Sequence, residues 1–313
     1  MGRYIPEYLN DTKNEPMTLN FVKQAIADNS ILEAKVIKCD DKYNLTVALG
    51  DNIYGKISLT EYEYRTDNET TKLNSVASKV NKHIRFIPKE INQVNGTYEV
   101  TCSRKEAQKE CFDNYITKLK PGDIIDARVI KIMSYGVFCD IGCGIAALLP
   151  TNNISVTHIV NASDLLKGTS KLRVIVKDTT NPFKIQLSHK ELLGTWEQEA
   201  AKFNEGDIVP GMVLSVEDYG IFVRISQNLS GLAEPTALTV NPGDIVSVQV
   251  LNIKSDNMKV RLYITEKIEF SSPAEEIEEK KLKFKYYITD NRITEWVYST
   301  PNSKKLIKSV FTE

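Results

Sequence analysis

An internal repeat constrains the fold of this chain more than any other feature of its sequence. Residues 120–150 read KPGDIIDARVIKIMSYGVFCDIGCGIAALLP, and residues 204–235 read NEGDIVPGMVLSVEDYGIFVRISQNLSGLAEP. Both segments open with Gly-Asp and a hydrophobic run, pass through Tyr-Gly-x-Phe and end near a Gly-Leu or Ala-Leu step. Two copies of one pattern indicate two copies of one structural unit.

Each copy is followed by two further β-rich runs, which predicts five short strands in a unit of roughly 60–70 residues. Strands of this number and spacing are typical of a small barrel. A weaker third copy lies at 31–59, and its last hairpin, at 83–105, turns at Asn95-Gly96. The predicted fold is therefore mainly β, with three tandem five-stranded barrels joined by short helices, plus a small C-terminal β-hairpin and helix.

Helix-like segments join the predicted barrels. Ser103 and Ser188 are each followed three residues later by a glutamate, Glu106 or Glu191, as at a capped helix start, and Gly194 interrupts the second helix. Along the chain we expect an N-terminal arm and helix at 1–28, a degenerate barrel at 29–104, a linker helix at 105–119, a second barrel at 120–188, a linker helix at 189–204, a third barrel at 205–266 and a C-terminal part at 267–313.

Composition bounds the class of protein. The 313 residues are 26% charged with a formal net charge of −1, and no apolar stretch reaches the length of about 18 residues that a membrane helix needs. The N-terminal stretch lacks the apolar region of a secretory signal, and five unevenly spaced cysteines are typical of reduced thiols. We expect a cytoplasmic protein with no membrane partner. Cys139 and Cys143 have no further ligands in sequence, so we expect no metal and no cofactor.

The repeated aromatic residues carry the functional signal. By strand alternation, Phe138 shares a face with Asp140, and Phe222 shares a face with Arg224. Since the residues on either side of each Phe are apolar, we expect the two Phe rings to point outward. Five-stranded barrels of this kind bind single-stranded nucleic acid by stacking bases on exposed rings beside cations. The alternative is that the rings fill the barrel.

The chain resembles the ribosomal protein S1 family, which is built from serial RNA-binding OB-fold modules. The resemblance is carried by GDIIDARVIKIMSYGVFCDIG, GDIVPGMVLSVEDYGIFVRIS, SGLAEP and KIQLSHKELLGTWEQEAAKF. It covers roughly 30–266 and is specific for 120–266. The arrangement of three modules with a short C-terminal appendage resembles the shortened S1-like proteins of clostridial-type bacteria. The resemblance implies S1-type barrels that bind single-stranded RNA or mRNA. The contacts would come from two aromatic residues, a His or polar residue, and an Asp and a basic residue in the last hairpin.

Transferred position by position, the family pattern fits the second and third modules. Pro150 and Glu234 stand at the His position, and the first module keeps only Tyr43, with Thr46, Ser58 and Glu99 at the other places. Lys131 and Arg224 join the expected contacts as neighbouring cations. The predicted RNA-binding residues are Tyr135, Phe138, Lys131, Asp178 and Lys184 in the second module, and Tyr219, Phe222, Arg224, Lys259 and Arg261 in the third.

Charge ranks the two modules. Residues 120–190 hold nine basic and five acidic side chains, a net of +4, whereas residues 205–266 hold four basic and eight acidic ones, a net of −4. Because phosphate contacts supply most of the non-specific affinity for nucleic acid, the module at 120–188 is the best RNA-binding candidate.

The C-terminal part is predicted to be structural. Residues 271–285 read as a charged linker, 283–299 as a hairpin turning at Asp290-Asn291, and 302–311 as a short amphipathic helix. An isolated hairpin is marginal in water, so we expect hairpin and helix to pack on the third barrel. The alternative is that Trp296 and Tyr298 form another stacking surface for RNA.

No enzyme is expected. His83, His158 and His189 stand in unrelated contexts, and no set of acids, bases and nucleophiles recurs at catalytic spacing. A small-molecule substrate is therefore not expected either. The remaining alternative to an mRNA-binding, translation-associated factor is a protein–protein adaptor on the ribosome or an RNA-processing complex, with RNA binding incidental. The first module, which has lost most aromatics, is the candidate for docking on the small ribosomal subunit.

Overall fold

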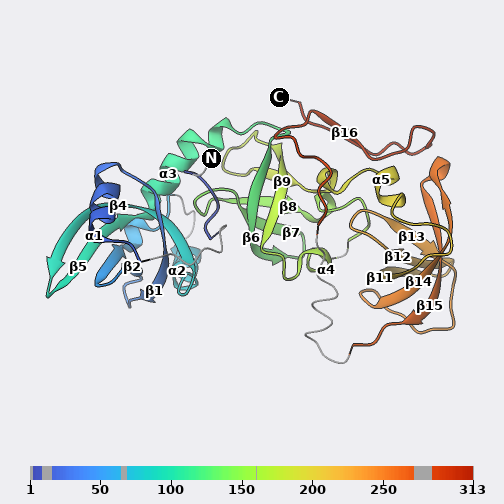
Figure 1. The fold of residues 1–313 in the computed structure, drawn as a ribbon, viewed down its shortest axis with the longest axis horizontal. Helices are drawn as coiled ribbons and strands as arrows, with labels where there is room; N and C mark the ends of the chain where they lie inside the picture. The colour runs from blue at the N-terminus through green and yellow to red at the C-terminus, as the bar shows by residue number, and fades with distance from the viewer. Residues whose placement is uncertain (1–2, 9–15, 65–68, 160, 271–283, 313) are drawn as a thin grey trace. The chain divides into compact units, whose positions relative to one another are not determined.

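Three closed five-stranded barrels make up most of this computed structural model, which describes residues 3–8, 16–64, 69–159, 161–270 and 284–312 (Figure 1). Their strand orders are β1-β2-β3-β5-β4, β10-β8-β7-β6-β9 and β11-β12-β13-β15-β14, and a further two-stranded sheet pairs β16 with β17. The mainly β fold of serial barrels predicted from the repeat is confirmed.

The first barrel consists of β1 Leu32–Cys39, β2 Leu45–Gly50, β3 Ile53–Ile57, β4 His83–Val94 and β5 Thr97–Ser103. The predicted turn between β4 and β5 is confirmed, because Asn95 and Gly96 both have positive φ, 49° and 80°, as a two-residue hairpin turn requires. Helix α1 Leu19–Ala27, capped by Thr18, packs Val22 and Ala25 into the core of this barrel. Two further elements, η1 Leu59–Glu61 and α2 Glu69–Ala77, lie between β3 and β4.

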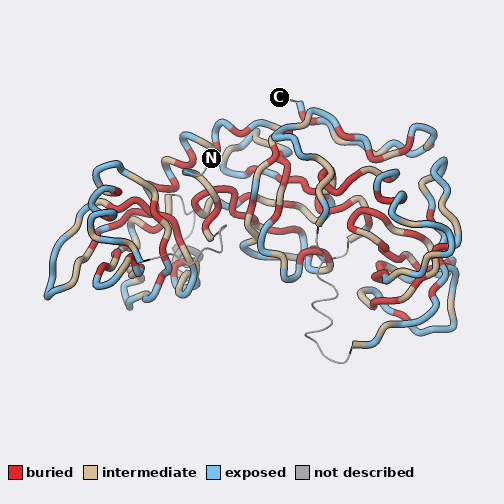
Figure 2. The backbone as a smooth tube through the Cα atoms, viewed as in Figure 1, coloured by how far each residue is buried: buried red, intermediate tan, exposed pale blue. Residues whose placement is uncertain are grey.

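The middle and third barrels repeat one plan. The middle barrel contains β6 Ile124–Met133, β7 Gly136–Asp140, β8 Ala146–Pro150, β9 Lys171–Asp178 and β10 Gln186–Ser188, with η3 Thr151–Asn153 and α4 Ser163–Leu166 between β8 and β9. The third contains β11 Ile208–Glu217, β12 Gly220–Arg224, β13 Ser230–Ala233, β14 Ile245–Lys254 and β15 Lys259–Lys267, with η5 Ser255–Asn257 at the tip of the last hairpin. Buried and exposed residues alternate along β15, as on a strand with one face in the core (Figure 2).

The two segments that follow the first and middle barrels differ in structure. After the first barrel, α3 Arg104–Asn114 starts at Ser103, whose hydroxyl accepts a hydrogen bond from the Glu106 amide, and η2 Ile116–Lys118 follows. After the middle barrel, the single helix expected at 189–204 is split into η4 Lys190–Leu193 and α5 Trp196–Ala200. Gly194 separates them with φ +95°, and Thr195 caps α5 in a capping box with Gln198.

The prediction of a C-terminal helix at 302–311 is wrong. Residues Lys308–Val310 form β17, which pairs with β16 Glu295–Val297 in an antiparallel sheet. Val310 is half-exposed whereas the next residue, Phe311, is buried, so the apolar residues follow the alternation of a strand. Asp290 and Asn291 do not turn a hairpin, because residues 284–289 before them form no strand. The Asn291 carbonyl instead accepts a hydrogen bond from the Ile124 amide of β6. The expected charged linker lies mostly outside the described residues.

This C-terminal segment, residues 284–312, packs on both barrels beside it. Trp296 and Tyr298 are buried in the core cluster of the third barrel together with Trp196 of α5. Phe311 is buried with Ile124 and Ile175 of the middle barrel. The expected packing on the third barrel is therefore present and extends to the middle barrel.

The chain divides into two compact units. One comprises residues 1–119 with 126–128 and the turn at 140–146, and the other comprises 120–125, 129–139 and 147–313. The second unit holds all the residues predicted to bind RNA. Among the described residues, no helix is long and apolar enough to cross a membrane.

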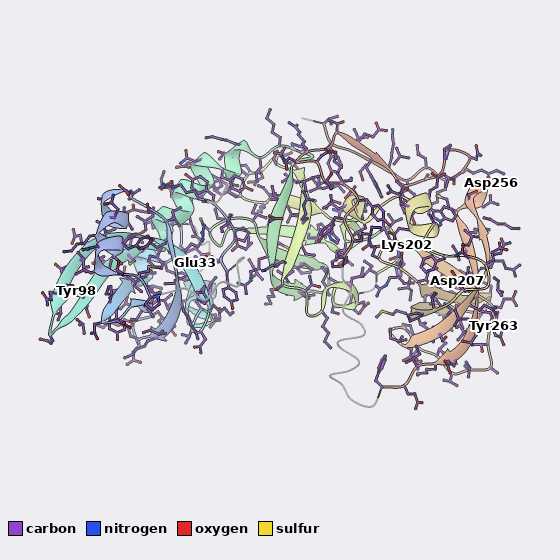
Figure 3. All side chains as sticks on the ribbon, viewed as in Figure 1. Glu33, Tyr98, Lys202, Asp207, Asp256 and Tyr263 are labelled. Carbon is purple, nitrogen blue, oxygen red and sulfur yellow. The ribbon has the colours of Figure 1, made fainter. Side chains whose placement is uncertain are left out.

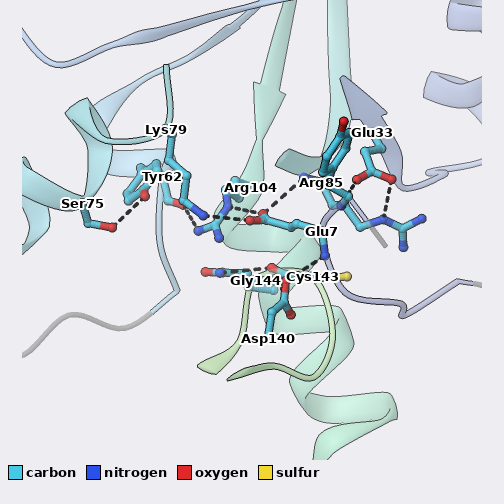
Figure 4. Close-up of polar contacts among 12 residues, drawn as sticks. Glu7, Glu33, Tyr62, Ser75, Lys79, Arg85, Arg104, Asp140, Cys143 and Gly144 are labelled. Carbon is cyan, nitrogen blue, oxygen red and sulfur yellow. Dashed lines mark hydrogen bonds and ion pairs between the residues drawn. The ribbon is translucent and has the colours of Figure 1, made fainter. Parts of the chain in front are cut away.

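A buried polar network lies within the first unit (Figure 4). The Glu7 carboxylate pairs with Arg104 at 2.7 Å and Lys79 at 2.9 Å. Burial alone would raise the pKa of Glu7, but these two cations lower it to about 2. The Glu7 amide donates to Asp140, whose pKa burial raises to about 7. The N-terminal arm is thus part of the core of this unit, which the sequence did not predict.

Candidate nucleic-acid interface

A Tyr–Phe pair stands at the same place in the middle and third barrels. Tyr135 and Phe138 have ring centroids 6.2 Å apart at an interplanar angle of 89°, and Tyr219 and Phe222 are 6.2 Å apart at 85°. Each Tyr is more than half exposed, at 54% and 66%, and each Phe is half-buried. The rings therefore lie on the outer surface of each barrel and are absent from the buried cores.

The glycine after each Tyr explains why the Tyr-Gly-x-Phe pattern recurs. Gly220 has φ +151°, and a Cβ there would lie 2.6 Å from the carbonyl oxygen of Ala233 on the neighbouring strand. Gly136 has φ +158°, and its Cβ would lie 2.5 Å from the carbonyl oxygen of Leu149. Because only glycine tolerates such an approach, the turn keeps each Tyr beside the Phe two positions after the glycine.

In the third barrel, strand register extends Phe222 into a row of five residues across the outer face. Phe222 is opposite Ser215 on β11 and Leu232 on β13, and Leu232 is opposite Arg261 on β15, which is opposite Asn252 on β14. β-Bulges in β11 and β14 adjust the register on either side of the row. We call these residues the third row: Ser215, Phe222, Leu232, Arg261 and Asn252.

The middle barrel has the equivalent row. Leu148 of β8 is opposite Gln186 of β10, which is opposite Asp178 of β9. The repeat spacing of 84 residues puts Lys131, Phe138 and Leu148 at the places of Ser215, Phe222 and Leu232. The middle row therefore consists of Lys131, Phe138, Leu148, Gln186 and Asp178, and it contains three of the residues predicted from the sequence.

The predicted hairpin residues of the middle barrel lie at one end of this row. Asp178 accepts hydrogen bonds from Thr180, which lower the pKa of its carboxyl group. Lys184 is exposed in the loop before β10, two residues from Gln186. Lys131 is exposed on β6 at the other end of the row. Cations thus stand on both sides of the Tyr135–Phe138 pair.

In the third barrel, one of the two predicted β15 cations is paired. Lys259 is exposed at the start of β15. Arg261, in the row itself, forms an ion pair of 2.6 Å with Glu234, and both side chains are more than half exposed. The Glu234 carboxylate therefore pairs with the Arg261 guanidinium group, which is the group that would contact a phosphate.

Arg224 is not at this surface. It is only 5% exposed, its guanidinium donates to the Asp164 carbonyl and lies 3.4 Å from Met212 Sδ, and burial lowers its pKa to about 10. Alternation along β12 places it on the outer face, but α4 and Met212 cover that end of the strand. Asp140 of β7 is also buried, at 2% exposed, and there the Glu7 amide of the N-terminal arm donates to its carboxylate. The expectation that Arg224 meets RNA is therefore withdrawn.

The first barrel repeats the register but not the chemistry. The same pattern of strand pairs and β-bulges gives a row in the first barrel: Lys38, Thr46, Lys56, Thr101 and Glu90. Thr46 stands where Phe222 stands in the third barrel, as the sequence predicted. Lys56 lies 3.8 Å from Glu99. This face offers charges and hydroxyl groups where the other two barrels offer a ring pair.

Sequence reasoning missed several residues of these faces, among them one amide and one aromatic ring. Gln186 lies in the middle row, and Tyr263 lies two residues beyond Arg261 on β15 with 50% of its surface exposed (Figure 3). The alternation of KVRLYI at 259–264 was the available signal for Tyr263. Among the described residues, no group of three or more His, Cys, Asp and Glu side chains could hold a metal ion, and the five cysteines are free thiols.

Tandem five-stranded barrels with an outer ring pair define a class of nucleic-acid-binding modules, and the comparisons agree with that class. Residues 118–190 match the family described as S1 RNA binding domain. The chain is 26% identical over 219 residues to small ribosomal subunit protein bS1 of Staphylococcus aureus, covering 68% of this chain and 53% of that protein. The corresponding protein of Staphylococcus saprophyticus is 26% identical over 251 residues, covering 74% and 61%.

The middle barrel, which lies within residues 118–190, thus matches the S1 RNA binding domain family, and the resemblance of the chain to the ribosomal protein S1 family is confirmed. The chain spans about half the length of the curated relatives it matches, 53% for the Staphylococcus aureus protein. A solved multidomain protein with nucleic acid binding domains from Streptococcus pneumoniae covers 80% of this chain and 78% of its own at 12% identity, with a TM-score of 0.25.

Proposed function

We propose that this chain binds single-stranded RNA on the outer faces of its middle and third barrels, as a ribosome-associated factor of the S1 type. The proposed role is one of binding without catalysis. The observation that carries the proposal is the Tyr–Phe pair, which recurs with the same 6.2 Å separation in two barrels. The match of residues 118–190 to the S1 RNA binding domain supports it.

The proposed interaction combines base stacking with phosphate contacts. An unpaired base exposes a π face, and stacking on an aromatic side chain contributes about 1–3 kcal/mol per base. Tyr135 and Phe138 offer two such surfaces, and Lys131 and Lys184 stand near either end of the row for the phosphates. Polar residues at the end of the row, Gln186 and Asp178, offer hydrogen bonds to base edges.

Binding of labelled oligonucleotides to the full chain tests this proposal. We expect the fourfold variant Tyr135→Ala, Phe138→Ala, Tyr219→Ala, Phe222→Ala to lose at least about 30-fold in affinity for a single-stranded RNA, as the loss of two or more stacked bases implies. Its melting temperature should stay close to that of the parent chain, since the rings lie outside the cores. Phe21→Ala removes an equally exposed ring from α1 and should leave affinity unchanged. Unchanged binding by the fourfold variant would refute the proposal.

The first barrel is proposed to dock on the small ribosomal subunit. The observation that favours this role is the polar row Lys38, Thr46, Lys56, Thr101 and Glu90 in place of a ring pair. Co-sedimentation with purified small subunits tests it, with Lys38→Glu, Lys56→Glu compared with the fourfold ring variant. We expect the charge reversal to reduce co-sedimentation while oligonucleotide binding persists. If only the fourfold ring variant fails to co-sediment with the small subunits, the chain binds the ribosome through RNA on the other two barrels, and the proposed docking by the first barrel is wrong.

A further inference from the structure

The outer face of β15 continues beyond the third row. Lys259, Arg261 and Tyr263 are exposed in alternation with buried Val260 and Leu262. Tyr263 is half exposed and takes no part in the core cluster that includes Leu262. Among the residues that the structure describes, none forms a hydrogen bond with its hydroxyl group. The packing of the barrel therefore gives no reason for a large ring at this position.

The neighbours of Tyr263 are suited to an unpaired base. Gln249 of β14 is opposite Tyr263, and Ile208 of β11, which is 64% exposed, is opposite Gln249. On the other side of β15, the parallel strand β13 pairs Ala233 with Leu262. The next residue, Glu234, forms the ion pair with Arg261. A π face thus lies beside an amide that can both donate and accept hydrogen bonds.

The other two barrels cannot offer a ring at this place. The residue two positions beyond the row on the last strand is Ser103 in the first barrel and Ser188 in the middle barrel, and both are buried. There the strand ends, because Ser103 caps α3 and Ser188 bonds to Glu191 of η4 at 2.5 Å. β15 instead runs on to Lys267. Among the described residues, this part of the last strand stays open to a ligand in the third barrel alone.

The spacing places Tyr263 one binding position beyond the Tyr–Phe pair. Phe222 and Arg261 are separated by two strand-to-strand steps of about 4.8 Å, and Tyr263 lies about 6.6 Å further along β15, so Phe222 and Tyr263 are roughly 12 Å apart. Barrels of this type cover about 4–16 nucleotides. A single-stranded RNA that crosses the third row over Arg261 therefore reaches Tyr263.

We propose that Tyr263, with Gln249 beside it, forms a second base-stacking position on the third barrel, separate from Tyr219 and Phe222. The position rests on the proposed RNA binding and gives the third barrel a longer footprint on single-stranded RNA than the middle barrel has. Arg261 lies between the two positions, and it meets the connecting phosphate when its ion pair with Glu234 opens.

Oligonucleotides of different length test the position in the full chain. The middle barrel is silenced with Tyr135→Ala, Phe138→Ala, and affinity is measured for single-stranded RNAs of about four and about twelve nucleotides. We expect Tyr263→Ala to weaken binding of the longer RNA about 5- to 100-fold and to leave binding of the shorter RNA nearly unchanged. Tyr263→Phe, which keeps the ring, should bind the longer RNA like the parent chain.

The outcomes separate this position from the proposed function. If Tyr219→Ala, Phe222→Ala weakens binding but Tyr263→Ala does not at either length, the second position is refuted while RNA binding stands. If neither variant weakens binding, RNA binding by the third barrel itself fails. Phe21→Ala is the control for removal of an exposed ring, and equal melting temperatures show that Tyr263→Ala folds.

Discussion

At the scale of single residues, exposure decides which charges and rings can meet a ligand. Tyr219 and Arg224 are five residues apart, yet Tyr219 is 66% exposed and Arg224 is 5% exposed. Arg261 is exposed but already paired with Glu234 at 2.6 Å. Residue type therefore predicts an interaction only together with the cover and the partners that the fold supplies.

Replacing Glu234 by Gln should strengthen RNA binding to the third barrel. The change frees Arg261 for phosphate and removes a negative charge next to the row, which we expect to raise affinity about 2- to 5-fold at low salt. The measurement is oligonucleotide affinity in the Tyr135→Ala, Phe138→Ala background. Glu266→Gln removes the same charge near the end of β15 and is the control. If both variants gain equally, net charge alone matters and the ion pair does not compete with RNA.

His189 should make stability depend on pH. Its ring is fully buried, with Nδ1 3.1 Å from the Ile154 carbonyl and Nε2 3.4 Å from the Tyr286 hydroxyl. Burial lowers the pKa of His189 to about 4, so the unfolded chain binds the proton more readily. Stability from the neutral ring is complete above pH about 6.5 and is lost as pH falls towards 4, by about 3 kcal/mol.

Denaturant unfolding between pH 4 and 7 measures this effect. His189→Gln keeps a donor and an acceptor but does not titrate, so we expect it to have a shallower fall in unfolding free energy on acidification. The exposed His158 gives the control His158→Gln, which should fall as the parent does. A parent-like slope for His189→Gln would exclude the buried imidazole as the source.

At the scale of elements, the last strand of each barrel and the segment that follows it differentiate the modules. α3 follows β5 and η4 follows β10, whereas β15 continues to Lys267. The C-terminal segment adds a second difference, because Trp296 of β16 and Tyr298 just after it pack into the third core cluster. The barrels thus share a register and differ in what covers their ends.

Trp296→Ala should destabilise the unit without weakening RNA binding. Trp296 is 7% exposed, and truncating a buried Trp costs about 3–5 kcal/mol. We expect a lower melting temperature and unchanged RNA affinity at temperatures where the variant is folded. Val297→Ala, on the exposed face of the same strand, should melt like the parent. Weaker RNA binding with unchanged melting would favour a stacking role for Trp296 instead.

At the scale of the whole molecule, a buried amide ties parts of the second unit together. Asn228 of the third barrel accepts hydrogen bonds from Ser155 Oγ and the Val156 amide, and its side-chain amide donates to the Gly194 carbonyl at 2.9 Å. The Tyr298 hydroxyl donates to the Asn228 carbonyl at 2.7 Å. Both ring pairs therefore belong to one compact unit, which is why each should be tested within the full chain.

The two ring pairs should contribute unequally to RNA affinity. The net charge of +4 around the middle pair and −4 around the third predicts that Tyr135→Ala, Phe138→Ala costs more affinity at low salt than Tyr219→Ala, Phe222→Ala. The chain that retains only the middle pair should also show the steeper salt dependence between about 50 and 200 mM. Equal losses and equal slopes would show that the local cations, Lys259 and Arg261, outweigh net charge.

The sequence by itself determined the repeat, the barrel class, the turn at Asn95-Gly96 and the outward position of the two Phe rings. These follow from local rules, because strand alternation and glycine-dependent turns act over a few residues. Only the tertiary structure decided that Arg224 is covered by α4, that residues 308–310 pair with β16, and that Tyr263 stays open. Each of these depends on which distant segment packs against a strand, and alternation fixes the face of a residue but not the cover over that face.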